Sequence, residues 1–406
     1  MIVYIIAPIL VLVNTNYENI SFLSIYQYNI DMEILVLNPI APYDLEVDYS
    51  KVDNIHFSTK EIDGYNKDFN LVYSVREDGK TASFDLKSFS KLRRFQANPI
   101  MLLRQVNEVS EEYVDSLKRR WNKWLRKPID FYYSKKDLDN GLATLYFDKK
   151  KQSPAVKVVS LAKNVDITKK FFIARPGDLF IDEVVLNTRT GSKYLKGEVM
   201  KVKEIYKTFY REFANAKIPR PKFYGFGNPY SWYNPYNAEL GVDCEKIKEQ
   251  GNVQVIDKWA IMHHKMNPLL LEEIKKKDPL YSIEGEYSKY AYGGVAINDS
   301  NVRLVPKCPN EFNLVCIFYA NGKNFGIWQS YNYDSNLLYW IGTLKNIGKR
   351  REIFSFNFGD LIEGSALINS MDRLRFQSLK IAIGRREVGF ETLEANYIME
   401  EVYKLL

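Results

Sequence analysis

The segment PGDLFIDEVV, residues 176–185, carries the acidic side chains best suited to catalysis, namely Asp178, Asp182 and Glu183. We expect a strand here, and alternate residues of a strand share a face. Asp178 and Asp182 then point one way and Glu183 the other. Two carboxylates on one face can hold Mg²⁺ or Mn²⁺ for phosphoryl transfer. A solvated strand end that binds no metal is the alternative.

The acidic strand is followed by a basic helix and a Gly-containing aromatic loop, an order that loosely resembles the small catalytic subunit of archaeo-eukaryotic primases. The resemblance implies a metal-dependent polymerase, with an acidic pair on one strand and a histidine after a glycine turn on a later strand. The chain departs from that pattern in two places. Asp182 and Glu183 are adjacent, and Gly227 is followed by Asn228 instead of histidine.

Other motifs that carry chemistry are incomplete. Glu198 and Lys201 have one residue too many between them for the Glu-x-Lys pair of a restriction-type nuclease. The Gly/Lys turn at 191–197 lacks the Gly-Lys-Ser/Thr ending that a phosphate-binding loop needs. His263 and His264 are predicted on a helix, where adjacent side chains diverge by about 100° and do not easily share one metal. The sequence therefore predicts no metal site built from histidine.

Basic residues gather at two predicted helices. Cations at the end of a helix stabilise its dipole, which is the structural explanation. The functional explanation is contact with the phosphates of a nucleic acid. Our candidate nucleic-acid-binding residues are Arg119, Arg120, Lys123, Arg126, Lys127, Lys203, Lys207 and Arg211.

Aromatic residues are abundant, with 29 Tyr, 23 Phe and 6 Trp against only three His and three Cys. Many of them fall in residues 223–236, where Gly, Asn and Pro favour an irregular loop. Such a loop can contact a partner protein, stack on bases or pack onto its own core, and we expect the first. The predicted interface residues are Tyr224, Phe226, Tyr230, Trp232, Tyr233 and Tyr236.

Hairpin turns recur along the chain, which favours an α+β fold with mostly antiparallel sheets and two or more domains. The Asp78-Gly79 turn predicts one hairpin, with Thr81 to Leu86 as its returning strand. Three long amphipathic helices are predicted near 98–127, 198–216 and 255–277, and the last fifteen residues predict a terminal helix. The expected domains are 1–128, 129–278 and 279–406.

The first thirteen residues are almost wholly apolar, but they are too few to span a membrane and lack the basic start of a signal peptide. We expect a buried strand pair there, with Met32 as an alternative natural start. The expected location is the cytoplasm or a virion. Three free cysteines without a paired motif favour a reducing compartment.

The composition, rich in Lys, Ile, Tyr and Asn, favours a virus or mobile element of a thermophilic archaeon. We expect a non-enzymatic binding or assembly protein, such as a subunit of a nucleoprotein complex or virion, without a cofactor. Two alternatives remain open. One is a nucleic-acid-binding accessory protein. The other is a phosphoryl-transfer enzyme, primase-polymerase-like or a nuclease, that uses Asp178 and Asp182 with Mg²⁺ or Mn²⁺.

Overall fold

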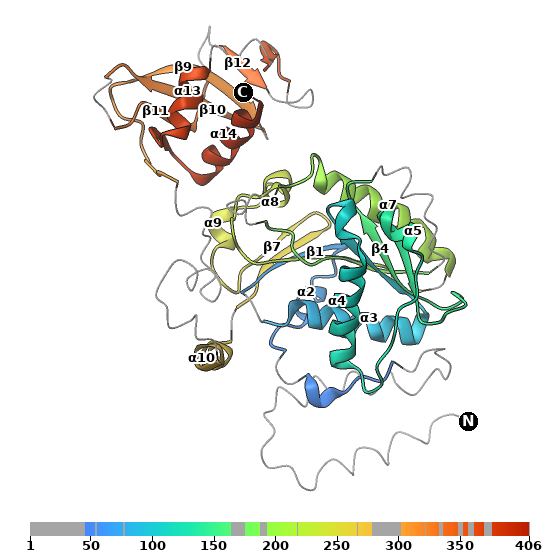
Figure 1. Cartoon of the computed structure of the whole chain (residues 1–406). Coiled ribbons are helices and arrows are strands. Elements are labelled where there is room, and N and C mark those ends of the chain that lie inside the picture. Colours follow the sequence, from blue (N-terminus) through green and yellow to red (C-terminus); the bar gives the residue numbers. More distant parts are fainter. Residues whose placement is uncertain are drawn as a thin grey trace, which may run out of the picture. The chain divides into compact units, whose positions relative to one another are not determined.

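Figure 1 shows the computed structural model of the protein. The structure describes residues 45–52, 55–75, 78–163, 175–186, 193–216, 218–265, 267–277, 302–320, 322–332, 336–347, 352–355, 361–368 and 376–405. The strands predicted before residue 45, and the alternative start at Met32, lie outside these residues.

The first sheet has eight strands in the order β3-β4-β2-β5-β6-β1-β8-β7. Only its two edge strands, β3 and β7, run antiparallel to their neighbours, while the strands between them pair in parallel. The strands are β1 (Phe69–Tyr73), β2 (Asn98–Leu103), β3 (Leu142–Tyr146), β4 (Pro154–Ser160), β5 (Pro176–Ile181), β6 (Phe223–Gly227), β7 (Val253–Ile256) and β8 (Trp259–His263).

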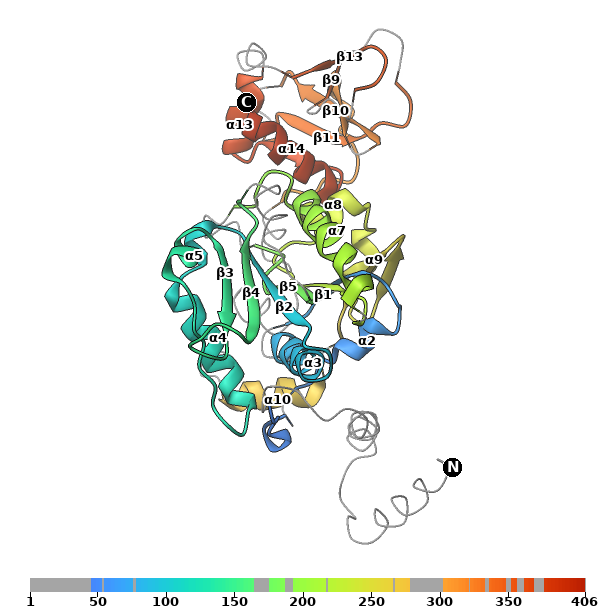
Figure 2. The same ribbon diagram turned by 90° about the vertical axis from the view of Figure 1, so that its right-hand side faces the viewer.

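Helices cover both faces of this sheet, because parallel strands need crossover connections that return over a face (Figure 2). One face packs against α2 (Thr59–Asp63), α3 (Lys80–Phe95), α4 (Glu111–Trp124) and α5 (Lys135–Asp139). The other face packs against α7 (Glu198–Ala216), α8 (Pro235–Leu240) and α9 (Cys244–Ile247). The remaining elements of this region are the short helices η1 (Tyr49–Lys51) and η2 (Val106–Glu108), and α10 (Pro268–Lys277).

A second, six-stranded sheet has the order β13-β12-β9-β10-β11-β14 and a core of its own. Its strands β9, β10 and β11 form an antiparallel meander, whereas β12, β13 and β14 join in parallel. The elements are β9 (Phe312–Ala320), β10 (Lys323–Ser330), β11 (Tyr339–Thr343), β12 (Ile353–Ser355), β13 (Ser365–Leu367), α13 (Gln377–Gly384), β14 (Val388–Phe390) and α14 (Leu393–Leu405).

The chain is thus built of helices and two mixed sheets, and the prediction of mostly antiparallel sheets is wrong. The predicted helix 198–216 is confirmed as α7, and the terminal helix is confirmed as α14. The helix predicted over 98–127 begins only at Glu111, because residues 98–103 form the buried strand β2. The helix predicted over 255–277 is likewise a pair of strands followed by α10.

Strands from residues 1–128 and 129–278 alternate within the first sheet, so the predicted boundary at residue 128 does not separate two sheets. The reason is that parallel strands pair with partners far along the chain. No helix among the described residues is both long and apolar enough to cross a membrane.

Candidate functional site

The parallel strands of the first sheet end at one edge, and that edge collects the polar side chains of the candidate site. Ligands of open α/β sheets bind at the carboxyl ends of the strands. Strand β1 leads into residues 74–81, and β5 into Asp182 and Glu183. The neighbouring strands end at Asn228, at His264 and at Arg104, which gives this edge both acidic and basic groups.

Residues 74–81 read Ser-Val-Arg-Glu-Asp-Gly-Lys-Thr and connect buried strand β1 to helix α3. This spacing matches the phosphate-binding loop, or P-loop, with Ser74 in place of its first glycine. Gly79 adopts φ +85°, and a Cβ there would lie 2.8 Å from Ile55 Cγ2. Only glycine suits both constraints, so the loop requires Gly79 immediately before the helix. Ser74 Oγ donates to the Asp78 carboxylate and ties the two ends of the loop together.

Lys80, the first residue of α3, folds its side chain back over the loop. Its Nζ donates to the carbonyl oxygens of Val75 at 2.7 Å and Ser74 at 3.0 Å, and lies 3.4 Å from Asn228 Oδ1. Burial lowers the pKa of Lys80 to about 8, and the charge of Asp78 opposes that shift. Its contacts are with neutral oxygens that phosphate oxygens can replace.

Thr81 brings the loop to the acidic strand. Its Oγ1 donates to Asp182 Oδ1 at 2.5 Å, and these residues are 101 positions apart in sequence. Asp182 and Glu183 follow the apolar strand β5 and are both exposed at the edge of the sheet. A hydroxyl and a carboxylate oxygen in contact form the kind of hard-oxygen ligand pair that Mg²⁺ prefers.

His264 and Asp78 form a buried pair beside the loop. His264 Nδ1 lies 2.6 Å from Asp78 Oδ2, and its Nε2 lies 3.1 Å from Glu61 Oε2. Burial lowers the pKa of His264, but the hydrogen bonds to Asp78 and Glu61 outweigh it and raise the pKa to about 9. The pKa of Asp78 is lowered, since the hydrogen bond from His264 outweighs the effect of burial. The pair is therefore charged at neutral pH.

Arg104, which follows β2, fixes the backbone behind the acidic pair. Its Nη1 donates to the Glu183 carbonyl at 2.5 Å and its Nη2 to the Val184 carbonyl at 3.1 Å. The same guanidinium pairs with Glu198 at 2.9 Å, and Tyr236 Oη donates to that carboxylate at 2.9 Å. Val184, Glu198 and Tyr236 are buried, whereas Glu183 is exposed. The network joins the start of α7 and helix α8 to the end of β5.

These residues suit a bound magnesium ion and not an all-protein metal cage. Among the described residues no group of three or more His, Cys, Asp or Glu side chains could hold a metal. Mg²⁺ in phosphate sites keeps several waters and takes only one or two carboxylates besides the phosphates of its substrate. Thr81 and Asp182 provide such a partial set, so the donors present fit Mg²⁺.

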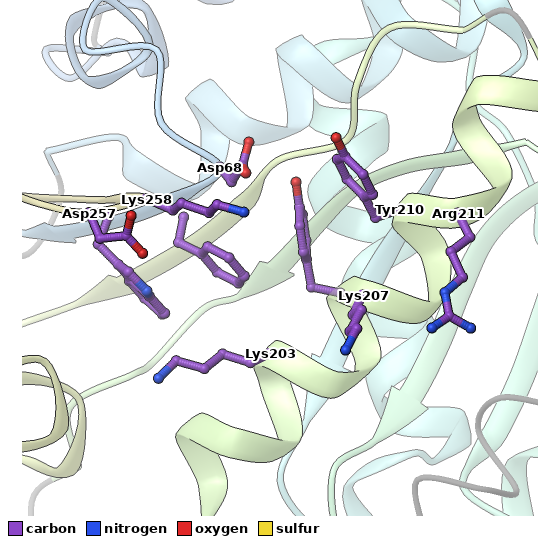
Figure 3. A pocket seen from close by; sticks show the side chains of 10 residues that line it. Asp68, Lys203, Lys207, Tyr210, Arg211, Asp257 and Lys258 are labelled. Atoms are coloured by element: carbon purple, nitrogen blue, oxygen red, sulfur yellow. The ribbon is translucent and has the colours of Figure 1, made fainter.

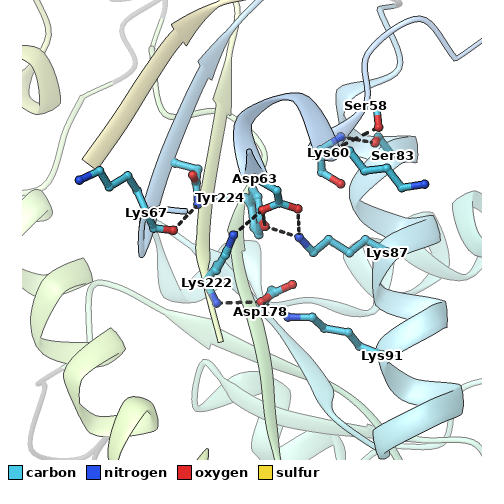
Figure 4. A network of polar contacts seen from close by, with 12 residues as sticks. Ser58, Lys60, Asp63, Lys67, Ser83, Lys87, Lys91, Asp178, Lys222 and Tyr224 are labelled. Carbon is cyan, nitrogen blue, oxygen red and sulfur yellow. Dashed lines mark hydrogen bonds and ion pairs between the residues drawn. The ribbon is translucent and has the colours of Figure 1, made fainter. Parts of the chain in front are cut away.

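Asp178 does not join this site, which corrects the predicted metal pair of Asp178 and Asp182. Four residues of strand span about 13 Å. Asp178 instead forms an ion pair with Lys91 at 2.6 Å and accepts from the backbone N–H of Lys222 at 2.7 Å (Figure 4). Next to it, the Asp63 carboxylate contacts Lys222 Nζ at 2.9 Å.

The predicted basic helix end separates into several structural roles. Arg120 forms a two-pronged contact with the buried Asp85 at 2.7 and 3.1 Å, and its Nη1 lies 4.0 Å from Asp182. Arg126 pairs with Glu46 at 2.8 Å, and Lys123 lies over the ring of Trp124. Arg119 and Lys127 are exposed. Of this group only Arg120 reaches the candidate site.

The predicted aromatic interface is core, which corrects that expectation. Tyr224 and Phe226 lie on β6, the strand between β1 and β5, and both are fully buried. Tyr230, Trp232 and Tyr236 pack against the α7 face with at most 4% of each side chain exposed, and Tyr233 is partly buried beside them. The glycines in this run give sheet positions without side chains, because a Cβ at Gly225 would lie 2.5 Å from Val184.

Sequence reasoning identified Asp182, Glu183 and Arg120 but missed the loop at 74–81, Arg104 and His264. A signal for the loop was present, since an apolar run, then Ser-x4-Gly-Lys-Thr, then a helical pattern is its signature. It was missed because Asp-Gly between two apolar runs is also a hairpin signal. His264 follows a strand and not a helix, so the predicted helical pair with His263 is wrong.

No protein-family model and no curated protein matches the sequence. Solved structures of similar fold include two that are matched over most of this chain. One is titled "The Phi-28 gp11 DNA packaging Motor", with a TM-score of 0.58, 15% identity, and 87% of this chain and 98% of that chain covered. The other is titled "The bacteriophage Phi-29 viral genome packaging motor assembly", with a TM-score of 0.55, 17% identity, and 86% and 99% covered. The similarity extends over both sheets.

Proposed function

We propose that this chain is a magnesium-dependent nucleoside triphosphatase that acts as a subunit of a viral DNA-packaging motor. The observation that carries the enzymatic part is the contact of Thr81 with Asp182. It places a P-loop helix and an acidic strand end at one edge of a parallel sheet. A P-loop with Mg²⁺ held by its Ser/Thr and by an aspartate at the end of a neighbouring strand is the arrangement of nucleoside triphosphatases.

The residues divide the work of hydrolysis among them. The backbone N–H groups at the N-terminus of α3 would bind the phosphates, because a helix N-terminus presents the positive end of its dipole. The side-chain ammonium of Lys80 would leave the carbonyl oxygens of Ser74 and Val75 and bind the oxygens of the terminal phosphates. Thr81 and Asp182 would hold Mg²⁺, which would neutralise the charge of the phosphates. Glu183, exposed beside them, orients and deprotonates the attacking water, and Arg104 holds the Glu183 backbone in place.

The similar structures support the motor assignment. Their titles name a DNA packaging motor and a viral genome packaging motor assembly, and each is covered over nearly its whole length. We therefore infer that this chain works in an assembly of copies on DNA. The proposal keeps the predicted viral, assembly and nucleic-acid roles. It replaces the predicted non-enzymatic protein, and the P-loop replaces the predicted primase-like metal pair.

A nuclease on the second sheet has less support. Metal-dependent nucleases need carboxylates on or beside their strands. Glu352, Glu387 and Glu391 flank β12 and β14 of this sheet, but among the described residues no group of three or more His, Cys, Asp or Glu side chains could hold a metal. The nuclease alternative is therefore not part of the proposal.

Nucleotide binding and turnover test the proposal separately. The wild type should hydrolyse ATP or GTP only with Mg²⁺. Lys80→Ala should abolish turnover and weaken nucleotide binding, whereas Glu183→Gln should abolish turnover and keep binding. Lys136→Ala, which changes an exposed lysine of α5, is the matched control and should behave as wild type. Failure of the wild type to bind either nucleotide with Mg²⁺ would overturn the assignment.

A further inference from the structure

A cavity of about 480 Å³ opens on the first sheet beside the starts of β1 and β8. Figure 3 shows the side chains that line it. Phe69 begins β1 and Trp259 begins β8, and they are paired in register at the amino ends of these parallel strands. The P-loop follows the carboxyl end of the same β1, about 16 Å away for a five-residue strand. The cavity is therefore a separate site. Its walls are Asp68, Phe69, Lys203, Tyr206, Lys207, Tyr210, Arg211, Asp257, Lys258 and Trp259.

The floor of the cavity is aromatic. Phe69 stacks on Trp259 with ring centroids 4.5 Å apart and an interplanar angle of 16°. Tyr206 meets Phe69 at 4.5 Å, and Tyr210 continues the row at 5.8 Å from Tyr206. Tyr210 is half-buried, and the guanidinium of Arg220 lies over its ring, 5.0 Å from the centroid. A flat ring or a sugar can pack against this floor.

The mouth of the cavity carries excess positive charge. Lys207 and Arg211 on α7 and Lys258 before β8 are exposed, and no side-chain hydrogen bond or ion pair joins them to another described residue. Asp68 is already neutralised by Arg220. Asp257 is then the one carboxylate facing these three cations across the cavity. Lys203, also on α7, pairs with Glu239 at 2.7 Å.

The spacing of the cations suits a sugar–phosphate backbone. Lys207 and Arg211 are one helical step of four residues apart, about 6 Å along the axis of α7. Each strand of DNA carries one phosphate per about 3.4 Å of helix axis, so cations about 6 Å apart can each meet a phosphate of the same strand. Cations at this spacing above an aromatic floor provide charge for the phosphates and stacking surface for the sugar or base between them. A simple anion would contact only the cations and would leave the aromatic floor unused.

We infer that this cavity binds one strand of a nucleic acid, with phosphates on Lys207, Arg211 and Lys258 and a sugar or base on the aromatic floor. The inference deepens the proposed function, because it locates a DNA contact on a motor that the P-loop would drive. It also gives a role to Lys207 and Arg211 of α7, which the sequence predicted to bind nucleic acid. Strand β1 connects this contact directly to the nucleotide loop.

The test measures binding of a labelled single-stranded oligonucleotide, and of a duplex of the same length, by fluorescence anisotropy over a salt series without nucleoside triphosphate. Lys207→Gln/Arg211→Gln should weaken binding at least tenfold at low salt. It should also flatten the slope of log K against log salt by about 1.4 for the single strand or 1.8 for the duplex. Tyr210→Leu should weaken binding several-fold with the slope unchanged, because it removes stacking and no charge.

The controls separate this inference from the proposed function. Lys136→Gln/Lys150→Gln removes the same charge from exposed positions away from the cavity and should bind as wild type. ATP turnover without DNA should survive in the Lys207→Gln/Arg211→Gln variant, so loss of turnover in Lys80→Ala tests the P-loop alone. Equal binding by the two double variants overturns the inference. So does equal displacement of the oligonucleotide by inorganic phosphate or an acidic peptide at the same concentration of charges.

Discussion

Thr81 Oγ1 and Asp182 Oδ1 lie 2.5 Å apart and join the first turn of α3 to the end of β5. One strand, β6, separates β5 from the strand that precedes Thr81. The contact therefore spans the space above Asn228, whose amide oxygen lies 3.4 Å from Lys80. Three neighbouring strands thus contribute to one site at their carboxyl ends, although residues 81, 182 and 228 are far apart in the chain.

Removal of the Thr81 hydroxyl should raise the Mg²⁺ requirement of hydrolysis. Thr81→Ala leaves Asp182 as the single protein ligand, so the Mg²⁺ concentration for half-maximal turnover should rise about tenfold or more. Thr81→Ser keeps the hydroxyl and should titrate close to wild type. The measurement is ATP turnover over a Mg²⁺ series at saturating nucleotide. Identical Mg²⁺ curves for the alanine and serine variants would contradict the assignment of Thr81.

The buried pair of Arg104 and Glu198 should act on turnover through Glu183. Arg104→Ala leaves the Glu198 carboxylate buried without its cation, which should cost about 3–5 kcal/mol of stability. Arg104→Met/Glu198→Leu removes both charges and should recover much of that loss. We expect kcat to stay low in the double variant with KM near wild type, because nothing then holds the Glu183 carbonyl. Recovery of kcat together with stability would show that the pair is only structural.

The His264–Asp78 pair should make stability depend on pH. The pKa of His264 in the folded protein is about 9, above its usual value near 6.5. The stability it contributes is therefore fully present below about pH 6.5 and is lost as the pH rises through 9, with a slope of at most about 1.4 kcal/mol per pH unit.

Denaturant unfolding between pH 6 and pH 10 measures this effect as the difference between wild type and His264→Gln. The difference is needed because Lys80 titrates in the same range with the opposite sign. Its folded pKa of about 8 lies below its usual value, so its loss of charge stabilises the fold as pH rises. A difference that does not shrink towards pH 10 would show that His264 is not charged in the fold.

The sequence correctly predicted segments whose residue pattern fits one kind of element. It failed for segments whose pattern fits two kinds of element. Helix α7 has an apolar stripe and no competing turn signal, and its prediction is confirmed. Residues 78–86 contain both a hairpin dipeptide and a P-loop ending, and only the pairing of β1 with β6 and β8 decides between them. Residues 98–103 follow the same rule, since Asn98 and Pro99 suit a helix start but lie in a buried strand.

The sequence could predict those site residues that a local pattern marks. Asp182 and Glu183 stand at the end of an apolar run, which marks them from sequence alone. Their partners Thr81 and Arg104 arrive through parallel pairing, and no local pattern fixes which strand lies beside which. The aromatic content led to the wrong prediction for Tyr224 and Phe226, which were expected at an interface and are buried. A strand that is covered on both faces is as rich in aromatic residues as a loop that contacts a partner.

Trp232 should behave as core and not as a contact residue. Its ring packs edge-on against Tyr73 at 5.5 Å and in a tilted arrangement against His263 at 4.7 Å, and 3% of the residue is exposed. Trp232→Ala should therefore cost about 3–5 kcal/mol, measured by denaturant unfolding. Tyr331→Ala, at an aromatic residue that is 63% exposed, is the comparison and should change stability little. A Trp232→Ala protein with unchanged stability would restore the interface prediction.

Arg120 should matter for stability and not for the salt dependence of nucleic-acid binding. Its guanidinium holds the Asp85 carboxylate, which is buried and also accepts from Trp121 Nε1 at 3.0 Å. Burial raises the pKa of Asp85, and Arg120 opposes that rise.

Arg120→Gln should therefore cost about 3–5 kcal/mol, since it leaves a buried carboxylate without its cation. Arg120→Gln/Asp85→Asn should recover part of the loss. The slope of log K against log salt for oligonucleotide binding should stay at the wild-type value in both variants, because Arg120 is already neutralised by Asp85. Arg119→Gln, at an exposed residue on the same helix, should leave stability unchanged. A slope flattened by about one unit in Arg120→Gln, with stability intact, would instead make Arg120 a phosphate contact.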